Sequence, residues 1–276
     1  MICLITSGVS QAGTCCVWRT TNTKAPVYLV GTIHALSGSD YPLPKPYEQA
    51  VRESDLILFE IDPSPKSDFP EKFRKAAKYP DGDEVGRHLH PKTRKLMFSA
   101  IRSVSWDWNQ LKHYRPWALA SLGWGIRGYN DVFSEYGVDD NLAHLGGRLH
   151  KKMGGLETTE QHIDVLRGMA DIDAELLLLD AMLNGPKKEK ESKVIRAAWR
   201  RGDIGPLVEE EARDRALNLG ANIRLLDYRN LRWMKRIDAE IKNGTPLAIV
   251  VGSAHFVGPN NLRELLEKRD YKIEQL

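Results

Sequence analysis

The sequence predicts an α/β protein, with an α+β arrangement as the alternative, built around a central and mostly buried sheet. Apolar runs of strand length alternate along the chain with longer stretches of helical character. Two of these runs, VYLVGTIH from Val27 and LAIVVGSAH from Leu247, end in the same Gly-x-x-His pattern. A continuous apolar run is typical of a strand that is buried on both faces. We therefore expect two buried strands, each followed at its carboxyl end by a loop that carries one histidine.

The elements between these strands can be assigned in order. The proline-rich stretch 41–46 is expected to be extended, and the apolar run LILF, residues 56–59, is expected to form a third buried strand. A short strand ending in GGLE precedes Thr158 and Gln161, whose spacing predicts a capping box at the start of a helix. Helices are predicted over residues 47–54, 91–100, 116–129, 171–184, 189–201, 206–218, 225–242 and 260–268, and a last strand over YKIEQL at the C-terminus.

We expect a single domain over residues 17–276, with a helical insertion at about 63–242, because no linker rich in Gly, Ser or Pro divides the chain. Residues 1–16 are uncharged and moderately apolar, as in a leader or the remnant of an export signal. A truncated signal would indicate a periplasmic or secreted protein, and a plain leader a cytoplasmic one. No apolar run approaches the ~20 residues of a membrane span.

The charge distribution excludes some partners. The formal charge of +3 arises from 40 basic and 37 acidic side chains that are spread along the chain. Since basic residues do not cluster with aromatic ones, nucleic-acid binding is not indicated. The chain also lacks the glycine-rich patterns of nucleotide-binding loops. This charge distribution is compatible with a peptide or small-molecule substrate.

Four side chains follow predicted strands and could form one site. His34 and His255 close the two Gly-x-x-His patterns, Glu60 follows LILF, and Glu157 ends GGLE. The carboxyl ends of strands are where open α/β sheets bind ligands. Two imidazoles and a carboxylate suit a divalent metal ion with an open position for water. The alternatives are a hydrogen-bonded histidine at each strand end, a solvated Glu60, and a Glu157 held by a helix dipole.

Weaker candidates lie elsewhere. His88 and His90 would share one face of a strand and could hold a second metal ion, although a loop with two exposed imidazoles explains them equally. Ser253 lacks the flanking glycines of a nucleophile elbow. Cys15 and Cys16 could act as nucleophiles or simply pack in the fold, and three cysteines cannot build a disulfide framework.

The ordered set of motifs resembles the TraB/GumN family, which includes the pheromone-shutdown protein PrgY and the Tiki proteins. The resemblance spans nearly the whole chain from about Val17. Its motifs are YLVGTIH, DLILFEID, RPWALA, YGVDDNLA, GGLETTEQ, WRRGD, YRNLRWM and VVGSAHFVGPNNL.

The resemblance implies a fold related to erythromycin esterase and ChaN-like proteins. It also implies a site at His34, Glu60 and His255, with Glu157 and Arg229 as further catalytic candidates. The implied activity is a metal-dependent hydrolase, a peptidase in the Tiki branch, in which His34, Glu60 and His255 would hold Mn2+, Co2+ or Zn2+. Two alternatives remain: a non-catalytic protein that sequesters a peptide or pheromone, and a metal-free hydrolase that uses His and Glu as acid and base.

Overall fold

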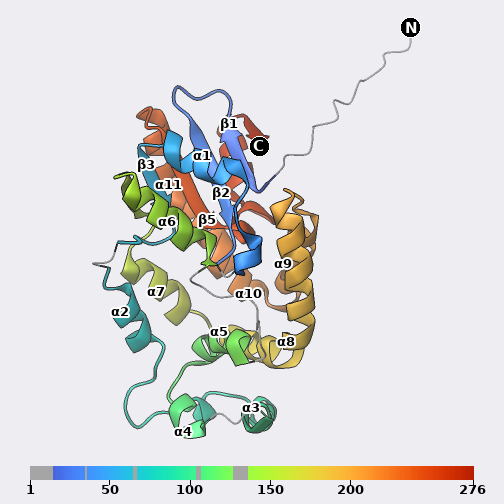
Figure 1. Ribbon diagram of the computed structural model, residues 1–276. Helices are drawn as coiled ribbons and strands as arrows, with labels where there is room; N and C mark the ends of the chain where they lie inside the picture. The colour runs from blue at the N-terminus through green and yellow to red at the C-terminus, as the bar shows by residue number, and fades with distance from the viewer. Residues whose placement is uncertain (1–14, 35, 65–66, 104–106, 127–135) are drawn as a thin grey trace.

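One six-stranded sheet organises the protein. The computed structural model describes residues 15–34, 36–64, 67–103, 107–126 and 136–276 (Figure 1). The strand order across the sheet is β4-β3-β5-β2-β1-β6. The strands are β1 (Val17–Thr20), β2 (Val27–Thr32), β3 (Leu56–Phe59), β4 (Lys152–Gly155), β5 (Leu247–Gly252) and β6 (Ile273–Gln275). The predicted α/β class is confirmed.

The two Gly-x-x-His strands are neighbours at the centre of this sheet. β2 pairs with β5 in parallel, β5 pairs with β3, and β3 pairs with β4, also in parallel. β1 and β6 add an antiparallel edge beyond β2. Every residue of β2 and of β5 is buried, as their continuous apolar sequences predict. The carboxyl ends of four parallel strands therefore meet at one edge of the sheet.

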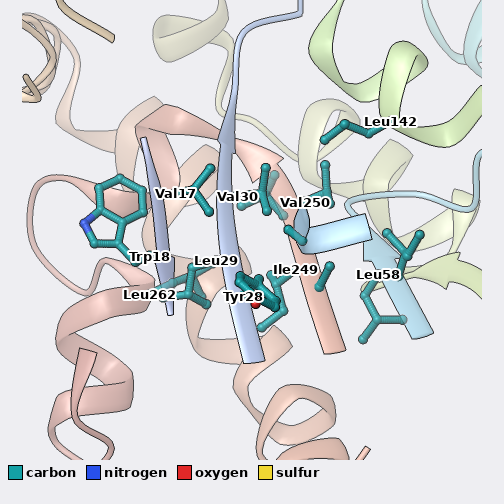
Figure 2. Close-up of a cluster of buried hydrophobic side chains, with 14 of the residues drawn as sticks. Val17, Trp18, Tyr28, Leu29, Val30, Leu58, Leu142, Ile249, Val250 and Leu262 are labelled. Atoms are coloured by element: carbon teal, nitrogen blue, oxygen red, sulfur yellow. The ribbon is translucent and has the colours of Figure 1, made fainter. Parts of the chain in front are cut away.

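Helices cover both faces of the sheet (Figure 1). The helices of the described residues are α1 (Lys45–Glu53), α2 (Phe69–Ala76), α3 (Pro91–Ser103), α4 (Trp108–Leu111), α5 (Pro116–Ile126), α6 (Val138–Arg148), α7 (Thr159–Arg167), α8 (Asp171–Arg200), α9 (Gly205–Leu217), α10 (Leu219–Asn222), α11 (Tyr228–Lys242) and α12 (Leu262–Glu267). Of these, α2 to α5 lie away from the sheet (Figure 1). The strand register places Leu29, Ile249 and Leu58 side by side on one face, among the core residues of Figure 2. Gly154 on this face lies against Arg236 of α11 and Leu58, so α11 packs here.

The opposite face packs against α1 and α6. Ile57 contacts α6 at Gly146, and Tyr28 donates a hydrogen bond to Glu53 of α1. The alternation of neighbouring residues between the two faces is the ordinary geometry of a strand.

The structure departs from the predicted helices at α8. Two helices are predicted over 171–184 and 189–201, because Gly185 and Pro186 are expected to interrupt a helix. Instead a single helix of 30 residues runs through them. Lys188, after the proline, pairs with Asp180 before it at 2.5 Å and with Asp214 of α9 at 3.4 Å. The first ion pair links the two halves of α8, and the second links α8 to α9. The end of the helix predicted over 116–129 lies outside the described residues.

The N-terminal segment joins the fold before residue 17. Cys15 and Cys16 are fully buried, and the Cys15 amide donates to the carbonyl of Leu276 at 3.1 Å. The rest of the predicted leader, residues 1–14, lies outside the described residues. Within the described part of the chain, no helix is both long and apolar enough to cross a membrane.

Candidate functional site

Four adjacent strands deliver side chains to one place. His34 follows β2, Glu60 follows β3, Glu157 follows β4, and His255 lies in the 3-10 turn Ser253–Phe256 that follows β5. Because these strands are parallel and adjacent in the sheet, their carboxyl ends converge. Arg229 approaches from the first turn of α11 and contacts three of these side chains. The structure thus brings all five predicted residues together.

The glycine of each Gly-x-x-His pattern permits close packing at the site. A Cβ atom on Gly252 would lie 3.2 Å from His34 Nε2 and 3.3 Å from Glu60 Oε1. A Cβ atom on Gly31 would lie 3.0 Å from Ser253 Oγ. Each pattern therefore uses its glycine to let the other strand end approach. Gly252 in particular brings His34 Nε2 and Glu60 Oε1 to the same small region.

His34 is held by a carboxylate at the mouth of the site. Its Nδ1 lies 2.8 Å from Asp139 Oδ2, and the other oxygen of Asp139 accepts a hydrogen bond of 2.9 Å from Thr32 Oγ1. A carboxylate only accepts hydrogen bonds, so Nδ1 carries the proton and Nε2 faces Glu60. The Asp139 charge raises the pKa of His34 to about 9. The side chain is 67% exposed, so solvent screens part of this attraction.

His255 has the opposite surroundings. It is 3% exposed, its Nδ1 lies 2.7 Å from Asn230 Oδ1, and its ring lies 4.6 Å from that of Trp233 between centroids. Its Nε2 lies 3.3 Å from Arg229 Nη1 and 3.7 Å from Glu60 Oε1. Burial lowers the pKa of His255 to about 3, against the attraction of Glu60. His255 is therefore a neutral imidazole at physiological pH.

Glu60 lies between the two histidines. Its Oε1 accepts a 2.9 Å hydrogen bond from the Gly252 amide, and its Oε2 accepts one of 2.5 Å from Arg229 Nη2. Burial alone would raise the pKa of this carboxyl. The positive charge of Arg229, with smaller contributions from His34 and from the Gly252 hydrogen bond, instead holds the pKa of Glu60 well below its ordinary value. Glu60 is thus an ionised acceptor at the site.

Glu157 is a buried carboxylate that accepts hydrogen bonds from several side chains around the site. Its side chain is fully buried, and its Oε1 accepts from Arg229 Nη2 at 2.7 Å and from His162 Nδ1 at 2.8 Å. Its Oε2 accepts from Trp233 Nε1 at 3.2 Å and from Arg232. Burial opposes ionisation, but the hydrogen bond from His162 and the charge of Arg229 lower the pKa of Glu157 to about 2. A carboxylate with this many donors has a structural role.

The N–H groups of Arg229 all face hydrogen-bond acceptors of the protein. Nε donates to Glu157 at 3.0 Å, and Nη1 faces the Leu225 carbonyl at 3.2 Å and His255 Nε2 at 3.3 Å. Nη2 donates to Glu60 and to Glu157. A guanidinium has five N–H donors, and these contacts use all of them. Arg229 therefore supplies positive charge and rigidity to the site rather than a free donor for substrate.

This arrangement does not fit the divalent ion that the sequence predicts. Within the described ranges, no group of three or more His, Cys, Asp or Glu side chains is placed to hold a metal ion. The Arg229 guanidinium occupies the position of a cation, next to His255 Nε2 and both glutamates. The buried charges of Glu60 and Glu157 are already matched by Arg229 and Arg232, so a divalent ion would add uncompensated positive charge.

The weaker candidates are placed elsewhere or engaged in packing. Ser253 Oγ is buried and donates to the Thr32 carbonyl at 2.9 Å. His88 stacks on Tyr79 and pairs with Asp83 at 2.9 Å, while His90 is exposed. Cys15 and Cys16 are buried in the core, and burial raises the pKa of the Cys16 thiol to about 12. A thiol in that state is a poor nucleophile.

Sequence reasoning missed the partners that distinguish the two histidines. Asp139 lies in YGVDDNLA at the start of α6, where an acidic residue is usually explained by the helix dipole. Asn230 lies in YRNLRWM directly after Arg229, and Thr32 stands two residues before His34. Both motifs stand out in the sequence, yet their contacts with the histidines depend on how α6 and α11 pack against the sheet.

Comparison with known proteins places the chain in one family. The TraB/PrgY/gumN family model matches residues 16–275, nearly the whole chain, so the chain belongs to this family. No curated protein and no solved structure shows a significant match.

Proposed function

We propose that this member of the TraB/PrgY/gumN family is a hydrolase of ester or amide bonds, including those of peptides, and that it uses acid–base chemistry without a metal ion. The observation that carries the proposal is that His34 Nε2 and Glu60 Oε1 both lie beside Gly252, while Asp139 bonds to the other ring nitrogen of His34, Nδ1. A histidine oriented by a carboxylate, with its free nitrogen facing the reaction space, is the arrangement of a general base.

In the proposed reaction, a water molecule is held by His34 Nε2 and Glu60 Oε1. In the neutral form of His34, which becomes dominant above pH about 9, Nε2 takes a proton from the water while the water oxygen attacks the carbonyl carbon of the substrate. The imidazolium that forms is stabilised by Asp139 at 2.8 Å. The tetrahedral intermediate then breaks its bond to the leaving group, which receives the proton from His34. The products are a carboxylic acid and an alcohol or amine.

The other side chains of the site support this chemistry without direct proton transfer. Arg229 fixes the orientation of Glu60, and its positive charge favours negative charge that develops nearby. Neutral His255 accepts a hydrogen bond from Arg229 Nη1, and Glu157 accepts hydrogen bonds from Arg229 Nε and Nη2. The reacting groups His34 and Glu60 follow buried strands within two residues, and Arg229, which holds Glu60, lies on α11, which favours a fixed geometry.

The test is hydrolysis of p-nitrophenyl esters and a fluorogenic peptide library by protein purified without chelators. Half of each preparation is treated with EDTA and dialysed, and metal content is measured in both halves. We expect turnover that EDTA leaves within about twofold and metal far below one ion per chain. Loss of activity on EDTA treatment with recovery on Mn2+, Co2+ or Zn2+ would overturn the metal-free reaction. Tight peptide binding without cleavage would instead identify a sequestering protein.

A further inference from the structure

The orientation of the Asn230 carboxamide can be assigned from its partners. Asn230 is 1% exposed in the first turn of α11. Its Nδ2 lies 3.0 Å from the carbonyl oxygen of Asn260 and 3.4 Å from that of His255. Carbonyl oxygens only accept hydrogen bonds, so the NH2 group must face them. The other end of the amide, Oδ1, consequently faces His255 Nδ1 at 2.7 Å.

This orientation determines the tautomer of His255. Oδ1 of a carboxamide only accepts, so the hydrogen bond to it requires a proton on His255 Nδ1. In the neutral ring Nε2 then carries a lone pair. That lone pair faces Arg229 Nη1 at 3.3 Å, where a donor N–H is available. The contacts on both ring nitrogens agree with a single tautomer.

The tautomer has a consequence for Glu60. The His255 lone pair takes one N–H of Arg229 Nη1, and the adjacent Nη2 is left to bind Glu60 Oε2 and Glu157 Oε1. The other tautomer would point an N–H at the guanidinium, and two donors would face each other at 3.3 Å in a buried site. Burial of such unpaired donors is costly. Arg229 would have to move away, and Glu60 Oε2 would lose the hydrogen bond from Arg229 Nη2.

We propose that Asn230 is a positioning residue of the site, which locks His255 in the Nδ1–H tautomer and through Arg229 holds Glu60 in place. The kinetic consequences rest on the proposed hydrolase, while the tautomer itself does not. The Asn230 side chain bonds to His255 and to the Asn260 carbonyl, and not to the proposed reacting groups His34 and Glu60.

The first experiment measures the tautomer without substrate. Protein labelled with 15N in its histidines is examined by long-range 1H–15N correlation spectra, with the His255 signals assigned from a His255→Gln variant. We expect a protonated Nδ1 and an unprotonated Nε2 in the wild type. Asn230→Leu, which has no acceptor, should lose this state, and Asn230→Asp, which keeps an oxygen at the same position, should keep the proton on Nδ1. A protonated Nε2 in the wild type would overturn the assignment. An unchanged tautomer in Asn230→Leu would show that Arg229 alone sets the tautomer and would overturn the role proposed for Asn230.

The second experiment separates positioning from folding. On the ester or peptide probes, Asn230→Leu should lower kcat by roughly 10- to 100-fold, as for loss of other orienting partners of a site histidine, with KM changed much less. Asn243→Leu is the matched control, since Asn243 is exposed at the other end of the same helix. Equal loss in both variants, or a change in KM alone, would contradict a positioning role. If neither wild type nor variants turn over any probe, the proposed hydrolase fails, and the tautomer measurement still decides the role of Asn230.

Discussion

The ends of β2 and β5 carry the same short pattern, yet they place their histidines in opposite states. His34 is 67% exposed beside a carboxylate, which raises its pKa to about 9. His255 is 3% exposed beside a carboxamide and a guanidinium, and burial lowers its pKa to about 3. The difference does not come from the patterns themselves. It comes from α6, which brings Asp139 to His34, and from α11, which brings Asn230 and Arg229 to His255.

The comparison also separates two roles within one site. A histidine whose charge can change at the protein surface can move a proton, whereas a buried neutral histidine with both nitrogens engaged is suited to hold its neighbours. The sheet supplies proximity, and the helices that pack on it supply the difference in chemistry.

Removing Arg229 should have the largest effect on the site, because Arg229 bonds to His255 and to both glutamates. Arg229→Met would leave Glu60 and Glu157 buried with much less compensating charge, so we expect the free energy of unfolding to fall by ~3–5 kcal/mol. Activity should be lost with it. Urea denaturation measures the first effect. Arg236→Met on the same helix is the control, because Arg236 is bonded to the Gly155 carbonyl and not to a carboxylate. Equal stability of the two variants would contradict the central position of Arg229.

Replacing the exposed His34 should lower catalysis with little effect on the fold, unlike the replacement of a core residue. The raised pKa means that the His34–Asp139 pair stabilises the fold below about pH 9, but solvent screens this exposed pair, so His34→Gln should lose much less stability than a core variant. Loss of a general base should lower kcat by roughly 10²–10⁴-fold. The reverse is expected of Leu58→Ala in β3, which is fully buried. That variant should lose ~2–5 kcal/mol of stability through a cavity in the core and keep its kcat per folded molecule. Unfolding of His34→Gln to the extent of Leu58→Ala would make His34 structural.

A smaller effect is expected where the two strand ends touch. The added Cβ in Gly252→Ala would lie 3.2 Å from His34 Nε2 and 3.3 Å from Glu60 Oε1, so both groups must shift by a few tenths of an ångström. We expect kcat to fall by roughly tenfold, because the reacting groups lose their alignment. In Gly147→Ala the new Cβ meets nothing within 4 Å, and activity should be unchanged. Indistinguishable kinetics of the two variants would show that the His34–Glu60 approach is not used.

The fold and the location of the site follow from local sequence, but the chemistry of the site does not. Continuous apolar runs predict β2, β3 and β5, and the capping box at Thr158 and Gln161 forms as predicted. The polar residue after each strand then locates the site edge. What sequence could not show is the charge balance, because Arg229 fills the place of the expected metal ion only once α11 packs on the sheet.

Even the continuity of α8 through Pro186 required tertiary information. Local propensity favours a break there, but Lys188 pairs across it with Asp180 and also with Asp214 of α9. The same limit explains why the partners of the histidines were missed. Asp139 and Asn230 lie 105 and 25 residues from the imidazoles that they orient.

The pH dependence of kcat/KM tests the central claim, that His34 acts as a base oriented by Asp139, most directly. Neutral His34 is the active form, so the rate should rise tenfold per pH unit below the raised pKa and level off near pH 9. In Asp139→Asn the anion that raises the pKa is gone, so the plateau should begin at lower pH. Its height should also fall, since the new carboxamide can turn its NH2 group toward Nδ1 and select the wrong tautomer. The Asn230 amide cannot turn in this way, because two carbonyl oxygens hold its NH2 group. A rate that falls as the pH rises from 6 to 9, or a profile that Asp139→Asn leaves in place, would contradict the account.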